Sequence, residues 1–191
     1  MSVSSERVIL RLLPPMDQPT PKSAVPGAPG RLESIQISSG GVPKRAVSGS
    51  VEITANGVSG DRQRDLRIHG GPDRAVCLFS LEVIDELRAQ GHPIDRGTTG
   101  ENLTLVGVEW SEVVTGTRLR VGEVLLEVTR PANPCRNIAG SFADGDFSRL
   151  SAKLHTGRSR MYARVIEPGR VQPGDAVLCF QQRAALEAAQ D

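Results

Sequence analysis

Stretches of strand length recur along the chain, and in most of them apolar and polar residues alternate. Alternation puts successive side chains on opposite faces of an extended backbone, so each stretch predicts a half-buried β-strand. Asn56-Gly57 and Gly122-Glu123 separate neighbouring stretches and are typical of turns. The predicted strands cover residues 32–37, 47–54, 75–79, 103–106, 117–121, 124–128, 161–166 and 176–180.

Helical spacing is confined to a few segments. Ser80 is a predicted N-cap, Leu81, Ile84 and Leu87 follow at helical spacing, and Gly91 ends the helix. Two further helices are predicted, over residues 147–154 after a cap at Asp146 and over residues 183–190. Because strands and helices do not alternate regularly, a doubly wound parallel sheet is disfavoured. The pattern predicts a β-rich α+β fold, a closed or nearly closed β-barrel with a few peripheral helices.

The chain divides into three parts by composition. Residues 1–30 are rich in proline and glycine and predict an extended arm, residues 31–181 form the predicted globular domain, and residues 182–191 form a tail. No stretch approaches the 18 or more apolar residues of a membrane span. Arg11 interrupts the short apolar piece near the N-terminus, which argues against a signal peptide. We therefore expect a cytoplasmic protein that does not bind membranes.

Charge and cysteine content narrow the function classes. The 191 residues carry 23 basic and 22 acidic side chains, a net charge of +1, which argues against a general nucleic-acid or membrane-surface binder. The three cysteines form no C-x-x-C pair, so neither a disulfide framework nor a structural zinc site is predicted. A reducing compartment follows.

One cysteine differs from the other two in its surroundings. Cys77 and Cys179 lie within apolar runs and are interpreted as small hydrophobic residues of buried strands, whereas Cys135 lies in a proline-containing loop after a predicted strand. Arg130 and Arg136 flank it, and positive charge favours a thiolate. Such a thiolate is a nucleophile or a ligand for a soft metal. By residue type alone, an inert loop cysteine is an equal alternative.

Two further polar clusters interrupt the apolar pattern. Residues 60–74 contain four arginines, Arg62 among them, three aspartates and His69 beside two glycines. The cluster is suited to an anion such as phosphate, although a self-paired, solvated charge cluster fits the composition better. The second cluster is Gly100-Glu101-Asn102. A functional polar segment at the start of the next strand and an ordinary turn are equal alternatives for it. A cysteine hydrolase remains possible, with Cys135 as nucleophile and His69 or His155 as base.

The order of these motifs resembles the MOSC domain family, named after the molybdenum-cofactor sulfurase C-terminal domain. The resemblance covers about residues 31–181 and is closest to small stand-alone bacterial members. It rests on the following motifs in this order: Gly60-Asp61-Arg62-Gln63, the run from His69 to Val76, Gly100-Glu101-Asn102-Leu103, Val121-Gly122-Glu123, Pro134-Cys135, Tyr162-Ala163-Arg164-Val165 and Val171-Gln172-Pro173-Gly174-Asp175.

The resemblance implies a barrel of the pyruvate-kinase insert type that binds molybdenum cofactor (molybdopterin), a pterin dithiolene with a phosphate. It implies that Cys135 is the molybdenum ligand and acts in catalysis with His69. It also implies reduction of N-hydroxylated small molecules, an external electron-donor reductase, and, as a property associated with the family name, pyridoxal phosphate binding. The cofactor-binding residues that we expect on this basis are Arg62, His69, Asn102, Arg130 and Arg136.

This chain departs from the family pattern beside its loop cysteine. Many members carry an arginine two or three residues before the cysteine, where this chain has Asn133 and Ala132, and Arg130 lies five residues before it. A second function also fits the resemblance, namely a non-catalytic module that carries the cofactor, or sulfur as a persulfide on Cys135. The sequence leaves the oligomeric state open, a dimer included.

Overall fold

The structure is a computed structural model that describes residues 29–62 and 71–180. The predicted arm over residues 1–30 therefore lies almost entirely outside the described residues. The predicted helix over residues 183–190 and His69 also lie outside them.

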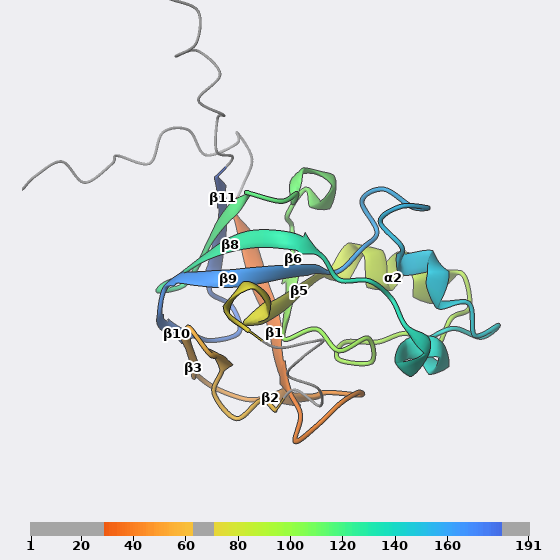
Figure 1. Ribbon diagram of the computed structural model, residues 1–191, viewed down its shortest axis with the longest axis horizontal. Helices are drawn as coiled ribbons and strands as arrows, with labels where there is room; N and C mark the ends of the chain where they lie inside the picture. The colour runs from red at the N-terminus through yellow and green to blue at the C-terminus, as the bar shows by residue number, and fades with distance from the viewer. Residues whose placement is uncertain (1–28, 63–70, 181–191) are drawn as a thin grey trace, which may run out of the picture.

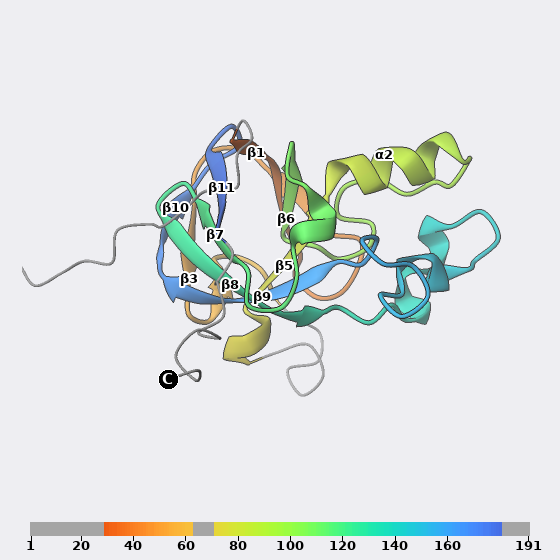
Figure 2. The ribbon, with the colours of Figure 1, turned by 90° about the horizontal axis from the view of Figure 1, so that it is seen from above.

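Seven strands close into a barrel (Figures 1 and 2). Around the ring each strand pairs with the next in the order β11-β7-β8-β9-β5-β6-β1, and β1 pairs back with β11. All of these pairings are antiparallel except that of β5 with β6. The strands are β1 (Gly30–Ile37), β5 (Val76–Ser80), β6 (Leu103–Val106), β7 (Arg118–Val121), β8 (Val124–Pro131), β9 (Met161–Glu167) and β11 (Ala176–Phe180).

The remaining strands are short and lie beside the barrel. β2 (Arg45–Val47) pairs with β1, while β3 (Val51–Thr54) pairs with both β4 (Gly57–Val58) and β10 (Gly169–Val171). The prediction of one strand over residues 47–54 was therefore wrong. Gly49 has φ +83°, a left-handed conformation that glycine adopts readily and that interrupts an extended strand.

The predicted helix after Ser80 is confirmed. Helix α2 (Leu81–Ala89) begins with the Ser80 side chain accepting a hydrogen bond from the Val83 amide, and its buried face packs against β5 and β6. Four 3-10 turns complete the described secondary structure: η1 (Pro72–Arg74), η2 (Trp110–Glu112), η3 (Arg136–Ser141) and η4 (Phe147–Leu150).

The helix predicted over residues 147–154 is much shorter than expected. Asp146 does cap it, but the helical turn ends at Leu150. Leu150 is fully buried, whereas Leu154 is 66% exposed. Without a second buried turn, nothing in the tertiary structure stabilises a longer helix.

The apolar core fills the barrel and confirms the expected fold class, a β-rich closed barrel with few helices. Leu119 and Val121 of β7, Leu126 of β8 and Val177 of β11 are almost fully buried and are cross-strand neighbours on three adjacent strands of the ring. Within the described ranges, no helix is long and apolar enough to cross a membrane.

Candidate functional site

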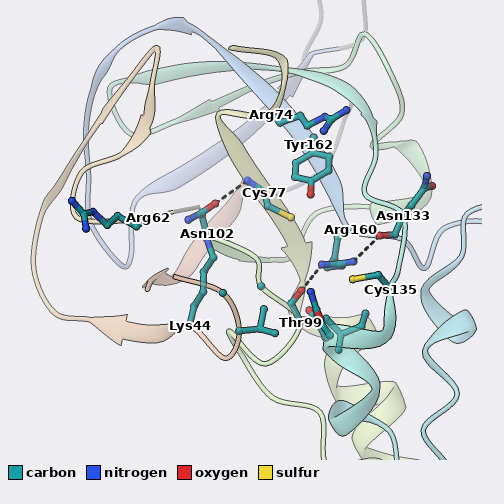
Figure 3. A pocket seen from close by; sticks show the side chains of 15 residues that line it. Lys44, Arg62, Arg74, Cys77, Thr99, Asn102, Asn133, Cys135, Arg160 and Tyr162 are labelled. Atoms are coloured by element: carbon teal, nitrogen blue, oxygen red, sulfur yellow. Dashed lines mark hydrogen bonds between the residues drawn. The ribbon is translucent and has the colours of Figure 1, made fainter. Parts of the chain in front are cut away.

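A pocket lies on the outer face of the barrel, against β5 and β9. In β5, Val76 and Leu78 belong to the core, so the intervening Cys77 points to the opposite face. Tyr162 of β9 is the cross-strand partner of Cys77 and shares that face. Both side chains line a pocket of about 700 Å³, counted with its open mouth (Figure 3). The inner face of these two strands therefore packs in the barrel core, and their outer face forms one wall of the pocket.

Loops from three parts of the chain build the other walls of the pocket. They are residues 41–44 before β2, residues 99–102 before β6 and residues 133–138 after β8. The first two loops are packed so tightly that a Cβ atom at Gly97 would lie 2.4 Å from the Lys44 carbonyl oxygen, and Gly97 has φ +80°. Only glycine meets both requirements. The chain before β6 is therefore held against the chain before β2, which fixes this side of the pocket.

Cys135 lies where the chain leaves β8 and enters η3. Its backbone is extended (φ −144°, ψ 169°), and its carbonyl oxygen accepts a hydrogen bond from the Ile138 amide. The residue is half-buried and lines the pocket. Ala132, three residues earlier, donates its amide to the Arg160 carbonyl oxygen at 2.8 Å, so the proline-containing loop is tied to the start of β9. This arrangement presents a thiol to the pocket from a supported loop.

A buried arginine lies next to this loop. Arg160 is 6% exposed and lines the pocket. Its guanidinium donates to two main-chain carbonyl oxygens, those of Thr99 and of Asn133, the latter at 3.5 Å and two residues before Cys135 (Figure 3). Its Nε atom is buried and has no partner among the residues that the structure describes.

A hydrogen-bonded network occupies the opposite wall. Lys44 and Asp61 form an ion pair at 2.5 Å with both side chains largely buried. The Asn102 amide donates to Asp61 Oδ2 at 2.8 Å and to the Gln36 carbonyl oxygen at 3.2 Å, and its oxygen accepts from the Cys77 amide at 3.1 Å. Lys44, Asn102 and Cys77 line the pocket, and Asp61 and Gln36 are hydrogen-bonded to these lining residues. Asn102 thus joins β1 to β5 and uses its polar atoms within the protein.

Both protic side chains on the strand face are neutral near pH 7. Burial raises the pKa of the Cys77 thiol to about 11, although the positive charges of Arg160 and Lys44 act in the other direction. Burial also raises the pKa of Tyr162 to about 12. Loss of water disfavours the charged form of each group. Neither group supplies negative charge to the pocket.

The structure brings together some of the predicted site residues. Cys135, Asn102 and Arg62 all line the pocket, and Arg62 is exposed, on the far side of Asn102 from Cys135 in Figure 3. Arg130 and Arg136 are exposed and are not among the residues that line it. Arg130 is the cross-strand partner of Tyr162 and lies on the same face, near the rim.

His69 lies outside the described residues, so its predicted role stays a prediction. None of the described residues that line the pocket is a histidine, and His155 is not among them. The metal-free hydrolase therefore lacks a base within the part of the pocket that the structure describes. No group of three or more His, Cys, Asp or Glu side chains suited to a metal ion occurs within residues 29–62 and 71–180.

Sequence reasoning missed several residues of the pocket, Cys77, Lys44 and Arg160 among them, whereas Arg74 belongs to the polar cluster of residues 60–74 that it singled out. Cys77 is buried as expected, but it faces the pocket and not the barrel core, because it alternates with Val76 and Leu78. A signal for Arg160 was present in the sequence. It precedes Tyr162 by two residues, so an extended backbone puts both on one face.

A thiol, several cationic side chains and two neutral side chains of the strand face thus line one pocket on a small closed barrel. Comparison with known proteins specifies the class further. The family model of the MOSC domain matches residues 65–178, more than half of the chain. The chain belongs to the MOSC domain family.

Curated relatives support this assignment. The chain is 35% identical over 137 residues to the uncharacterized protein YflK of Bacillus subtilis, covering 70% of this chain and 60% of the relative. It is 33% identical over 148 residues to protein YiiM of Escherichia coli, covering 75% and 65%. It is 30% identical over 183 residues to a protein named "Reductase" of Gibberella moniliformis, covering 86% of this chain and 30% of the relative. The chain thus spans less than two thirds of the length of the curated relatives it matches.

A solved structure shares the fold. The crystal structure of YiiM from Geobacillus stearothermophilus superposes with a TM-score of 0.66 at 24% identity, covering 82% of this chain and 78% of that chain. This likeness confirms the MOSC-type barrel.

Proposed function

We propose that this chain is an oxidoreductase that binds molybdenum cofactor through Cys135 and reduces N-hydroxylated small molecules. One observation carries the proposal. The half-buried thiol of Cys135 lines the same pocket as the buried guanidinium of Arg160, which forms no ion pair with a described carboxylate. A thiolate is a ligand of choice for a soft metal, and a guanidinium recognises the oxygen atoms of an anion. Molybdenum cofactor carries both a metal and a phosphate.

The residues present fit this cofactor. Cys135 offers the sulfur ligand, and the described residues that line the pocket include no carboxylate and four cationic side chains: Lys44, Arg62, Arg74 and Arg160. Cys135 would hold the metal, while Arg62 and Arg74, together with His69, would contact the phosphate or the pterin. Asn102 would keep the wall formed by β1 and β5 in place. When bound, the cofactor would supply two-electron chemistry at its metal.

The same pocket does not favour pyridoxal phosphate. That cofactor is held covalently by a lysine. Lys44 is the lysine among the lining residues, and its ammonium is ion-paired with Asp61. We therefore leave pyridoxal phosphate out of the proposal.

The reaction requires electrons from another protein. Converting an N–OH group into N–H with release of water consumes two electrons and two protons. The relative named "Reductase" supports a reductive role, and about 70% of its length lies outside the match to this chain. An external reductase would supply the electrons to this chain. We expect the working partners to be this reductase and the N-hydroxylated substrate.

Metal content tests the proposal directly. Wild type, Cys135→Ala and Cys179→Ala would be expressed in a host that makes the cofactor, and molybdenum per chain would be measured by elemental mass spectrometry. We expect near-stoichiometric molybdenum in wild type and in Cys179→Ala, and a loss of at least tenfold in Cys135→Ala. Reduction of an amidoxime by a chemical electron donor should follow the metal content.

Two results would contradict the assignment. Undiminished molybdenum in folded Cys135→Ala would exclude Cys135 as the ligand. Absence of molybdenum from wild type, with a persulfide sulfur on Cys135 detected by mass spectrometry, would instead favour the sulfur-carrier function. The Cys179→Ala variant controls for general effects of removing a thiol, because Cys179 packs against the core and is not among the residues that line the pocket.

A further inference from the structure

We propose that Arg160 is the anchor of an anion-binding subsite in this pocket, and that it binds a phosphate or carboxylate group of a ligand beside Cys135. The inference deepens the proposed function and rests on it for the identity of the pocket. It adds a residue and a chemical requirement, namely that whatever occupies this part of the pocket carries negative charge. The subsite is built from the chain's own residues, so it should bind a simple oxyanion in the absence of any metal.

Arg160 has no carboxylate in direct contact among the described residues. Lys44 has its counter-ion in Asp61, whereas Arg160 forms no ion pair within 4 Å with any described residue. The buried carboxylate of Glu101 does not contact Arg160 directly, and its oxygens accept hydrogen bonds from the Gly97 amide and the Thr99 hydroxyl. Cys77 and Tyr162 are neutral near pH 7, because burial raises the pKa of each.

The hydrogen bonds of Arg160 are also incomplete. Its guanidinium has five N–H donors, and the two carbonyl oxygens of Thr99 and Asn133 leave Nε without a partner among described residues. A buried charge without a counter-ion is strongly unfavourable. An oxyanion in the pocket would remove both deficits at once, because a guanidinium binds such groups with paired N–H···O bonds.

A second arginine shows the contrast within the same chain. Arg149 also has a buried Nε without a described partner, but its Nη2 pairs with Asp144 Oδ2 at 2.6 Å. That ion pair raises the pKa of Arg149 and lowers the pKa of Asp144, as expected for two groups that stabilise each other's charge. The charge of Arg149 is therefore paired without a ligand, and Arg149 does not line the pocket. It is the matched control for Arg160.

The first test titrates the metal-free protein with inorganic phosphate. Wild type, Arg160→Lys, Arg160→Met and Arg149→Met would be compared by isothermal titration calorimetry and by the phosphate-dependent shift of Tm. We expect phosphate to bind wild type and raise its Tm. Arg160→Met should bind at least tenfold more weakly and lose the Tm shift, Arg160→Lys should keep part of both, and Arg149→Met should match wild type.

The outcome is decisive even if one variant folds poorly. Equal phosphate affinity in Arg160→Met and wild type would overturn the proposal, and so would the absence of any phosphate binding by folded wild type. Arg160→Lys retains the charge but not the forked geometry, so a clear weakening there supports the subsite independently of Arg160→Met. None of these measurements involves molybdenum, so they separate this inference from the proposed function.

The second test identifies the source of the anion. Molybdenum content of Arg160→Met would be measured after expression with cofactor, together with KM for two amidoximes that differ by one carboxylate. Lost molybdenum with Cys135 intact would place the phosphate of the cofactor on Arg160. Retained molybdenum with a KM raised at least fivefold for the carboxylated substrate alone would place the substrate there. Unchanged values in both measurements would overturn a role for Arg160 in ligand binding.

Discussion

The two faces of β5 and β9 differ in role: the inner face packs in the barrel core, and the outer face lines the pocket. On the inner face, Val76, Leu78 and Ala163 are fully buried among apolar side chains of the barrel. On the outer face, Cys77 and Tyr162 are paired across the same strands and line a pocket with four cationic residues. A shift of a single residue in strand register would exchange the two faces. The same backbone therefore supports both packing and chemistry.

The difference shows where this fold contains buried polar groups that lack some of their hydrogen-bond partners. Inside the ring, apolar side chains pack against one another. Outside it, buried polar groups are held by specific partners, as Asn102 and Asp61 are, or are left incomplete, as the guanidinium of Arg160 is. Complete networks position the site, and incomplete ones mark where a ligand is expected. The predictions below test this distinction.

The largest effect is expected on the inner face. Replacing Leu78 with alanine removes a fully buried side chain and leaves a cavity in the barrel, so the free energy of unfolding should fall by about 4 kcal/mol. Denaturant unfolding would measure it. Leu154→Ala is the control, because that side chain is 66% exposed and should change stability by less than about 0.5 kcal/mol. Equal losses in the two variants would contradict the assignment of Leu78 to the core.

A smaller effect is expected from the polar network. Asn102→Ala deprives the buried Cys77 amide of its acceptor and leaves Asp61 and the Gln36 carbonyl with one donor fewer. Unsatisfied buried groups of this kind should lower the free energy of unfolding by about 2 to 3 kcal/mol. Asn137→Ala is the control, since Asn137 lines the same pocket but is exposed. A loss below about 0.5 kcal/mol in Asn102→Ala would show that the network is not needed to hold the wall.

Much of the fold could be predicted from local patterns in the sequence. Alternation located the barrel strands because a half-buried strand imposes a two-residue period on its own sequence. The pairing of β1 with β11 that closes the ring joins residues far apart in the chain, and no local pattern reports it. The strand predicted across Gly49 failed because alternation of side-chain type does not reveal a positive φ.

The candidate site was predicted less completely for a similar reason. Cys135 and Asn102 stood out as polar residues at the ends of apolar stretches, which is visible locally. Cys77 was hidden because residues 75–79 are all apolar, so the sequence did not tell which side chains face the barrel. The two-residue spacing from Tyr162 places Arg160 on the same face, but only the tertiary structure shows that Arg160 is buried. Arg136 follows Cys135 directly and Arg130 lies five residues before it, yet neither is among the lining residues.

The smallest effect concerns the outer face and depends on pH. The pKa of Cys77 rises from 9.0 to about 11 on folding, so the folded state holds the thiol proton more tightly than the unfolded state does. Its contribution to stability is complete below pH 9 and is lost as the pH rises toward 11. The free energy of unfolding of wild type should therefore fall by about 1 kcal/mol more than that of Cys77→Ala between pH 8 and pH 10, as measured by denaturant unfolding at both values.

Burial also raises the pKa of Cys179 to about 11, and that group titrates equally in both proteins, so the difference isolates Cys77. Identical pH dependence in wild type and Cys77→Ala would mean that the Cys77 thiol is open to solvent, and that the outer face of β5 is wetter than its packing indicates.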